Sequence, residues 1–410
     1  MKPIDIFIKF LRKSVKKDGF IINYDGDKYI VGQPLSQKPI EVCLNKKNLP
    51  LKLILCPDLY FGEAYVNSDI VIKNGNISDF FEIYMSNISN EDLSIRESLV
   101  KSLAPMCSWL FGRINTIGRS KKNVSHHYDL SNDLYELFLD KKMQYSCGYF
   151  LNGDESIDEA QQNKINHIIR KLNISPGMKV LDIGSGWGGL SIEIAKKTDA
   201  LITGITLSDN QLKYSLKKAS EEGVSDQCTF RLEDYRNIVE KYDRIVSVGM
   251  FEHVGVGFYK TFFDKIHSAL TNDGVALLHT IGNLSKPRSV VPWITKYIFP
   301  GGYIPSLSEI SPCIQNSHLL TNDIEILRNH YAKTLNLWKK KFFLNKDKLN
   351  NKFDDKFIRM WDYYLTSCEM GFKYRDTCVF QIILSKKLHT LPYTRAVSYT
   401  HLTLPTIYSV

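Results

Sequence analysis

The sequence contains no apolar run long enough to cross a bilayer, which takes roughly 18–20 residues in a helix. Residues 1–17 (MKPIDIFIKFLRKSVKK) lack both an apolar core and a small-residue cleavage site, so they do not form a secretory signal. We therefore expect a cytoplasmic chain that is either free or peripheral on the inner face of a membrane.

Patterns typical of metal sites and disulfides are also missing. The 8 cysteines are scattered without a Cys-x-x-Cys pair, which argues against zinc. A disulfide framework is not expected in a chain of this size without an export signal. The adjacent pair His126-His127 does not suit a metal either, because neighbouring residues on a helix diverge by about 100°. The sequence thus predicts no metal site.

The length and the charge set the broad class of protein. A chain of 410 residues, 43% hydrophobic and 24% charged, is too long for one simple core and predicts two domains. The net charge of +9 favours anionic partners. Without zinc-finger spacing, an RNP motif or a long Lys/Arg block, we expect anionic lipid rather than nucleic acid. The alternative, a lysine-rich surface that only keeps the protein solvated, stays open.

Residues 1–110 are predicted to form a small α+β domain associated with lipid or membrane. Its first segment combines an apolar stripe at helical spacing with Lys and Arg on the other side, which indicates a basic amphipathic helix. The apolar stripe consists of Ile4, Phe7, Ile8, Leu11 and Val15. Such a helix either packs on its own domain or contacts anionic headgroups, and both interpretations remain open. A strand is expected at 69–73, and a helix followed by a basic linker at 91–122.

A second pattern, strands alternating with helices, fills most of the range 111–390. The expected strands are 179–183, 201–206, 243–248, 275–281 and 378–385, and the expected helices are 188–197, 209–222 and 259–270. This alternation predicts an α/β fold with a doubly wound parallel sheet. Residues 283–350 interrupt it with an aromatic loop and then a helix. Residues 391–410 fit neither pattern and are expected to be a non-native tail.

The most informative motif is LDIGSGWGGLS at 181–191. A strand ends at Asp182, a turn with Gly184, Gly186 and Gly188 follows, and a helix begins. Glycine lets the backbone approach a ligand, and the helix N-terminus offers free N–H groups. The spacing Gly-x-Gly-x-Gly, with Thr206 rather than an acidic residue ending the next strand, opposes NAD.

This loop is similar to motif I of class I methyltransferases, and further blocks follow in order. They are HHYDLSNDLYELFLD (126–140), MQYSCGYF (143–150), GITLSDNQ (204–211), RIVSVGMFEHVG (244–255), LLHTIG (277–282), PWITKYIFPGG (292–302) and HYAKTLNLW (330–338). Together they resemble the cyclopropane-fatty-acyl-phospholipid synthase family. The leading block LYFGEAYVNSDIVI (59–72) resembles the long phospholipid-acting branch of that family.

The resemblance implies a Rossmann-like catalytic domain at 111–390 and a reaction on a membrane. A methylene group from S-adenosylmethionine would be added across a cis double bond of a phospholipid acyl chain, leaving S-adenosylhomocysteine. The implied partner is a bilayer with unsaturated chains, and a homodimer remains an alternative to a monomer. Related enzymes that make methyl-branched chains or methylate a small amine share the framework and remain the alternative function. A third hypothesis, an inactive lipid-binding protein, is disfavoured by the intact motifs.

The resemblance also implies which residues hold the cofactor. Gly184 and Gly186 would face its methionine part, with Tyr145 and Ser146 closing over it. The remaining cofactor residues implied are Thr206, Leu207 and Gln211 near the ribose, Asp234 and Tyr235 near the adenine, and Asp182 and Gly188 in the turn. Ser185 stands where relatives commonly carry Cys, and since both are small we expect no loss.

Cyclopropane formation also needs a base. Methyl transfer to an alkene leaves a carbocation, and ring closure requires loss of a proton from the new methyl group. The resemblance implies that bicarbonate is this base and that it is bound by five residues: Glu252, His279, Tyr331, Cys147 and Ile281. Glu252 would orient it, His279 and Tyr331 would hydrogen-bond it, and the other two would contribute backbone N–H groups.

Three further features are interpreted more plainly. His253 is expected to be a supporting residue and Cys368 a buried, inert thiol. The aromatic segment 292–305 (PWITKYIFPGGYIP) could line an acyl channel, touch the bilayer or fold onto its own core.

Overall fold

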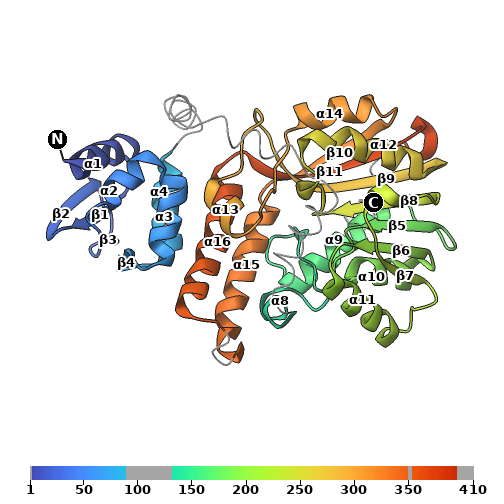
Figure 1. The fold of residues 1–410 in the computed structure, drawn as a ribbon, viewed down its shortest axis with the longest axis horizontal. Helices are drawn as coiled ribbons and strands as arrows, with labels where there is room; N and C mark the ends of the chain where they lie inside the picture. The colour runs from blue at the N-terminus through green and yellow to red at the C-terminus, as the bar shows by residue number, and fades with distance from the viewer. Residues whose placement is uncertain (1, 89–131, 350–352, 395–410) are drawn as a thin grey trace, which may run out of the picture. The chain divides into compact units, whose positions relative to one another are not determined.

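The computed structural model describes residues 2–88, 132–349 and 353–394, which form two compact units (Figure 1). Of these residues, the first unit contains 2–88, 289–300, 335–349 and 353–376, and the second contains the rest. The first unit thus includes segments from the range predicted for the catalytic domain. The predicted helix and linker at 91–122, the pair His126-His127 and residues 395–410 lie outside the described residues.

The N-terminal part of the first unit is an α+β structure, as predicted. Its sheet has the order β2-β1-β3-β4. Its strands are β1 (Gly19–Tyr24), β2 (Asp27–Gly32), β3 (Glu41–Leu44) and β4 (Ile70–Lys73), and its helices are α1 (Pro3–Ser14), α2 (Leu49–Leu55), α3 (Pro57–Val66) and α4 (Ile77–Asn87). Ile4, Ile8 and Leu11 of α1 are buried, so the apolar stripe of this helix packs on its own unit.

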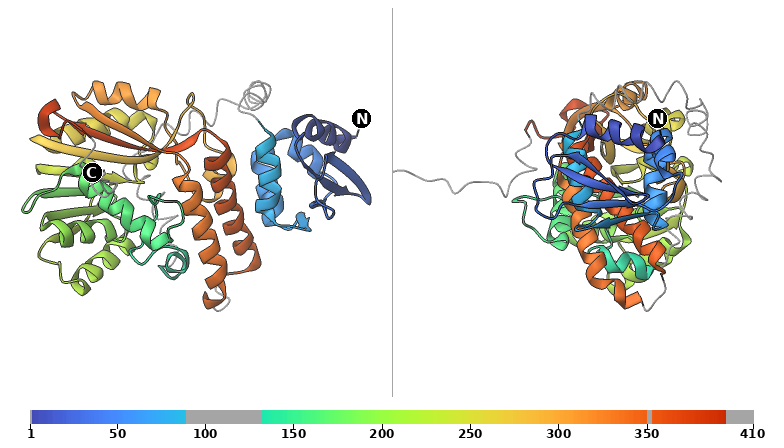
Figure 2. Two further views of the ribbon diagram at one scale, coloured as in Figure 1. Left: turned by 180° about the vertical axis from the view of Figure 1, so that it is seen from behind. Right: turned by 90° about the vertical axis from the view of Figure 1, so that its left-hand side faces the viewer.

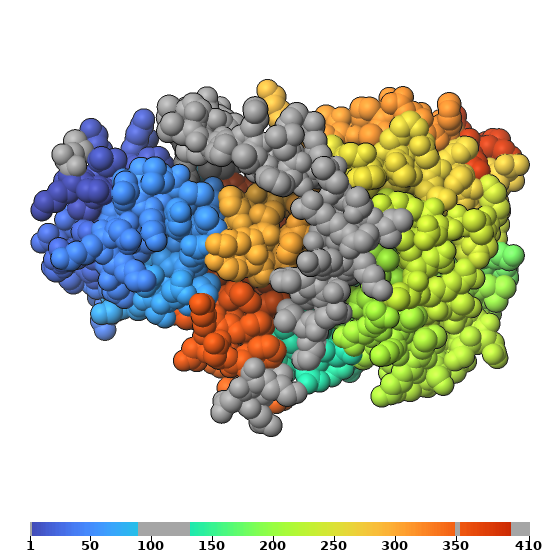
Figure 3. Space-filling model, in the orientation of Figure 1, coloured from blue at the N-terminus to red at the C-terminus, as the bar shows by residue number. Residues whose placement is uncertain are grey.

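Aromatic side chains bring α13 (Pro292–Tyr297) and α16 (Asp355–Tyr374) onto α3. Trp293 is buried, with its ring centroid 4.5 Å from that of Tyr363. A Cβ at Gly62 of α3 would come within 2.6 Å of both rings, so only glycine permits this approach. In Figure 3, segment 289–300 (gold) lies beside the N-terminal helices (blue). Trp293 therefore packs into a core, as in the last of the three interpretations given for the aromatic segment.

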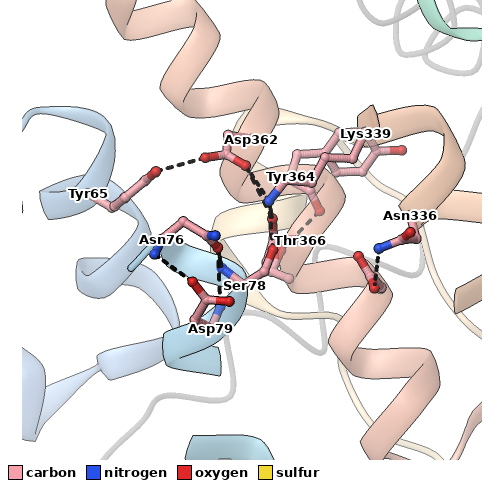
Figure 4. Close-up of polar contacts among 11 residues, drawn as sticks. Tyr65, Asn76, Ser78, Asp79, Asn336, Lys339, Asp362, Tyr364 and Thr366 are labelled. Atoms are coloured by element: carbon pink, nitrogen blue, oxygen red, sulfur yellow. Dashed lines mark hydrogen bonds and ion pairs between the residues drawn. The ribbon is translucent and has the colours of Figure 1, made fainter. Parts of the chain in front are cut away.

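A polar cluster joins the same distant segments (Figure 4). Lys339, on the part of α15 (His330–Asn345) that belongs to the first unit, donates to Ser78 Oγ at 2.7 Å and to Thr366 Oγ1 at 2.6 Å. It also forms a 2.7 Å ion pair with Asp362, whose other oxygen accepts from the Tyr65 hydroxyl at 2.8 Å. Residues 335–376 are thereby tied to the N-terminal helices by hydrogen bonds as well as by packing.

The second unit is built on a seven-stranded sheet with the order β10-β11-β9-β8-β5-β6-β7, which runs from top to bottom in Figure 1 and is seen from behind in Figure 2. The strands are β5 (Lys179–Ile183), β6 (Leu201–Thr206), β7 (Cys228–Leu232), β8 (Tyr242–Val248), β9 (Leu270–Asn283), β10 (Leu320–Leu327) and β11 (Thr377–Ser385). Strands β5 to β9 pair in parallel, whereas β10 and β11 are antiparallel. The five predicted strands are present, and β7 and β10 are additional.

Both faces of this sheet are covered by helices, which confirms the doubly wound fold. Alternate side chains enter different cores: Leu181 packs with α12 (Tyr259–Ala269) and α14 (Leu307–Gln315), and Val180 with α9 (Ile157–Leu172) and α10 (Gly189–Thr198). Further α-helices among the described residues of this unit are α8 (Asn132–Phe138), α11 (Asp209–Glu221) and the first turn of α15 (His330–Asn345). Residues 283–350 were predicted to form a loop and then a helix, but they also supply the edge strand β10. None of the described helices is both long and apolar enough to cross a membrane.

Candidate active site

A cavity lies at the carboxyl ends of β5, β6, β7 and β8, where open parallel sheets bind their ligands. Ten of the predicted cofactor residues line it: Tyr145, Ser146, Asp182, Gly184, Gly186, Thr206, Leu207, Gln211, Asp234 and Tyr235. Gly188 does not. A Cβ there would meet Ser215 Cβ at 2.7 Å and the Phe230 ring at 2.9 Å, so the structure assigns Gly188 to packing under the turn.

The glycine turn leaves room for a ligand. Gly184 and Gly186 adopt φ values of +82° and +56°, which disfavour residues with a Cβ. A Cβ at Gly186 would meet no atom of the described residues within 4 Å apart from its chain neighbours, whereas one at Gly184 would lie 2.8 Å from Met250 Cβ. The N–H groups of Gly184 and Ser185 both donate to Ile205 O at 2.9 Å and fix the turn to β6. The open side of Gly186 fits a bound cofactor.

Polar groups at the β6 and β7 end of the cavity are already paired with one another. Thr206 Oγ1 donates to Gln211 Oε1 at 2.7 Å. The Asp234 carboxylate accepts from Arg236 Nε at 2.8 Å and from its terminal nitrogen at 2.7 Å. Arg236, which was not singled out from the sequence, also lines the cavity and neutralises the charge of Asp234.

The β8 end is closed by the segment before α9. A Cβ on Gly249 would lie 3.9 Å from both Ser146 Cβ and Tyr145 O, so these residues flank the end of β8. The Tyr145 ring packs against Tyr135, with centroids 5.4 Å apart. The cavity therefore extends from Asp234 at β7 to Ser146 at β8.

Glu252 lies just after β8, in the short helix η2 (Phe251–His253). One carboxylate oxygen, Oε1, accepts from the N–H of Ile281 on β9 at 2.6 Å. The other, Oε2, is buried without a hydrogen-bond partner among the described residues. Burial raises the pKa of Glu252 to about 6, against the lowering effect of the Ile281 hydrogen bond. The side chain is thus held at one oxygen and open at the other.

His279 is oriented by a neighbouring strand. Gln381 Nε2 of β11 lies 3.1 Å from His279 Nδ1. An amide nitrogen only donates, so Nδ1 accepts and Nε2 carries the hydrogen. Nε2 is buried and has no partner within the described part of the chain. Burial holds the pKa of His279 well below its usual value, so the ring is a neutral donor at pH 7.

Cys147 and Tyr331 come from elements that contact each other. Gly148 N–H donates to Thr334 Oγ1 at 3.0 Å, and Phe150 N–H donates to His330 Nδ1 at 3.0 Å. The segment after Cys147 therefore packs on the first turn of α15, where Tyr331 lies partly buried. Burial raises the pKa of the Cys147 thiol, which remains neutral. The roles of these two residues stay predictions.

His253, which was expected to be a supporting residue, lines the cavity, and burial lowers its pKa to about 4, so it is neutral at pH 7. Gln144 and Trp187 also line the cavity and were not predicted from the sequence. Gln381, which orients His279, carried one available signal: it is a polar residue inside an apolar strand, VFQIIL. A buried polar side chain usually has a hydrogen-bond partner, so this glutamine indicated a polar contact inside the sheet.

Comparison with known proteins agrees with this geometry. The family model described as mycolic acid cyclopropane synthetase matches residues 116–382. Cyclopropane-fatty-acyl-phospholipid synthase of Escherichia coli (strain K12) is 41% identical over 272 residues, covering 65% of this chain and 70% of that protein. The structure of cyclopropane synthase MmaA2 from Mycobacterium tuberculosis matches with a TM-score of 0.62 and 33% identity, covering 65% of this chain and 98% of that one. Mycolic acid cyclopropane synthase CmaA1, solved with SAH and CTAB, matches with a TM-score of 0.61 and 34% identity, covering 64% and 97%.

Proposed function

Because the chain belongs to the mycolic acid cyclopropane synthetase family, we propose that it adds a methylene group from S-adenosylmethionine across a cis double bond of phospholipid acyl chains. Family membership makes it an S-adenosylmethionine-dependent methyltransferase. The phospholipid substrate, the bicarbonate base and the membrane location are the proposed parts. The observation that carries the proposal is a pair of buried atoms that have no hydrogen-bond partner among the described residues, Glu252 Oε2 just after β8 and His279 Nε2 on β9.

These two atoms match the needs of the reaction. The Glu252 carboxylate offers an acceptor, and the neutral His279 ring offers an N–H donor. An ion with one hydroxyl and two other oxygens, such as bicarbonate, satisfies both. Bound there, bicarbonate would supply the base that removes the proton of the transferred methyl group. Glu252 would hold the hydroxyl hydrogen of that base, and His279 would hold one of its oxygens.

The burial of the site serves the same chemistry. A carbocation is trapped by water, so the reacting carbon must be kept dry. Glu252, His279 and Cys147 are all buried, and Tyr303 N–H donates to Glu252 O at 2.9 Å, which fixes the segment after α13 over the glutamate. His279 presents its Nε2–H to the site while its Nδ1 lone pair accepts from Gln381, and the Cys147 thiol is protonated, so neither side chain offers a free lone pair or thiolate that a cation could alkylate.

We also propose that the first unit contacts an anionic membrane surface. The outer side of α1 exposes Ile6 (44%) and Phe10 (41%) beside Lys9 and Lys13, which are also exposed. Apolar side chains next to lysines suit the interface of an anionic bilayer. This outer side is distinct from the buried stripe, so packing on the unit and contact with lipid are compatible.

The test is to incubate the protein with labelled S-adenosylmethionine and vesicles of unsaturated phosphatidylglycerol and phosphatidylethanolamine, and to analyse the acyl chains by mass spectrometry. We expect chains heavier by one methylene that resist hydrogenation as rings do. Chains carrying a methyl branch would favour the alternative product. If no label enters the lipid and a small amine is labelled instead, the proposed phospholipid substrate is contradicted.

A further inference from the structure

Lys164 is a fully buried lysine of α9 that the mechanism above does not use. Its ammonium donates to Gln144 Oε1 at 2.6 Å and to Ser146 Oγ at 2.8 Å, and both of these residues line the cavity. One helical turn earlier, Gln161 Nε2 donates to Ser146 O at 2.8 Å. Side chains of α9 therefore hold both the backbone and the side chains of this wall of the cavity.

The hydrogen bond from Lys164 determines what Ser146 can do. An ammonium group only donates, whereas a hydroxyl both donates and accepts. Since Ser146 Oγ accepts from Lys164, its own hydrogen must point elsewhere and is available to an acceptor in the cavity. A hydrogen bond that ends on a charged group in a buried site is stronger than a neutral one. Ser146 thus becomes a polarised donor.

The charges around the cavity indicate which part of a ligand Ser146 would meet. At the β7 end, Asp234 is neutralised by Arg236. At the β8 end, Ser146 is backed by the buried ammonium of Lys164. Burial lowers the pKa of Lys164 to about 8, while Asp140, Cys147 and Asp182 act in the opposite direction, so it is charged at pH 7. An anionic group of the ligand is therefore favoured at the β8 end, next to Ser146.

We propose that Lys164 is a positioning residue for the amino-acid end of S-adenosylmethionine, which it serves by directing the Ser146 hydroxyl at the ligand carboxylate. This inference rests on the proposed function. S-adenosylmethionine has a single carboxylate, and placing it at the β8 end puts the neighbouring sulfonium at the same end as the Glu252 and His279 pair.

The test compares two ligands that differ in the amino-acid part. S-adenosylhomocysteine has the carboxylate, and 5′-methylthioadenosine lacks it. Calorimetry should show that Lys164→Met weakens the binding of S-adenosylhomocysteine roughly tenfold or more, as expected for a lost hydrogen bond to a charged group. Binding of 5′-methylthioadenosine should change by less than about twofold. Ser146→Ala should show the same selective loss, and adding Lys164→Met to Ser146→Ala should cause little further loss.

Lys171 provides a matched control. It lies two turns further along α9, is also buried, and forms ion pairs with Glu325 and Asp323. Lys171→Met should leave the ratio of the two affinities unchanged even where it lowers the melting temperature. Equal weakening of both ligands by Lys164→Met, or an unchanged S-adenosylhomocysteine affinity in Ser146→Ala, would overturn the inference. A wild-type protein that binds neither ligand would instead overturn the proposed function on which it rests.

Discussion

Gln381 and His279 are direct cross-strand partners in the antiparallel pair β11 and β9, with the amide nitrogen 3.1 Å from the ring Nδ1. The register of two strands thus selects the tautomer of the histidine. Gln381→Leu should lower turnover roughly two- to tenfold, the value of one hydrogen bond, because both tautomers then become accessible. S-adenosylhomocysteine affinity should be unchanged in calorimetry. An equal fall in affinity would mean that Gln381 supports the fold of the cavity instead.

Glu252→Gln tests the proposed base site most directly. An amide presents donors where the carboxylate accepts, so the base would be misoriented, and loss of a general base typically costs ~10²–10⁴-fold in rate. Cofactor binding should stay within a few-fold of wild type. Removing carbon dioxide from the buffer should slow the wild type, and added bicarbonate should restore it, with much less response in the variant. A wild type that is equally fast without bicarbonate would refute this base.

The pH dependence of turnover should have an acid limb near pH 6. Glu252, whose pKa burial raises to about 6, must be ionised to accept a proton, so kcat falls as the pH drops through that value. His253, with a pKa of about 4, and His279 remain neutral there and do not contribute. Asp182 also has a pKa of about 6 but lines the cofactor cavity, so kcat must be measured at saturating S-adenosylmethionine. A limb that persists in Glu252→Gln would assign it to another group.

Gly186→Val should abolish cofactor binding while the fold survives. The new side chain would extend into open space on the cavity side, where the ligand is expected, and a Cβ at a φ of +56° costs about 1–2 kcal/mol. Calorimetry should show no binding, with a circular dichroism spectrum like that of the wild type. Gly177→Val is the matched control, because that glycine has a φ of +75° and open space but does not line the cavity. If both variants bind S-adenosylmethionine normally, the cofactor site lies elsewhere.

Binding to anionic vesicles should depend on the outer side of α1. The double variant Lys9→Glu, Lys13→Glu should lower the affinity for phosphatidylglycerol vesicles roughly thirtyfold or more in a sedimentation assay at low salt. The reason is that each lysine near an anionic surface contributes ~1 kcal/mol. The difference should shrink as salt screens the charges. Lys213→Glu, Lys217→Glu on α11 repeats the same spacing at another exposed site and should have little effect. Equal losses in both double variants would show that only net charge matters.

Much of the second unit could be predicted because its inner strands carry their own signals. β5 and β9 are apolar and bounded by turn residues, and so they were found from the sequence. β7 and β10 lie at the two edges of the sheet, where burial is partial and the apolar pattern weakens. Their positions are set by pairing with β6 and β11, which local sequence does not encode.

The residues of the candidate site likewise divide into those that local sequence reveals and those that depend on distant partners. The glycine turn and Asp182 follow from one contiguous motif, but Gln381, Lys164 and Arg236 act through partners far along the chain or across the cavity. Lys164 stands on the apolar face of α9, beside Ile165 and Ile168, where a charged residue calls for a buried partner. That signal was available in the sequence. The identity of the partner was not, because it required the fold.

The first unit has a consequence for how the protein can be divided. Its N-terminal segment is completed by α13 and α16, which the chain reaches only after most of the second unit has been built. Removal of residues 1–111 would therefore uncover Trp293 and Tyr363. It would also leave Lys339 without Ser78 and Asp362 without Tyr65. The N-terminal region is thus not a detachable module. Ribosomal synthesis must finish residue 376 before the first unit can close, so this unit folds after translation of nearly the whole chain.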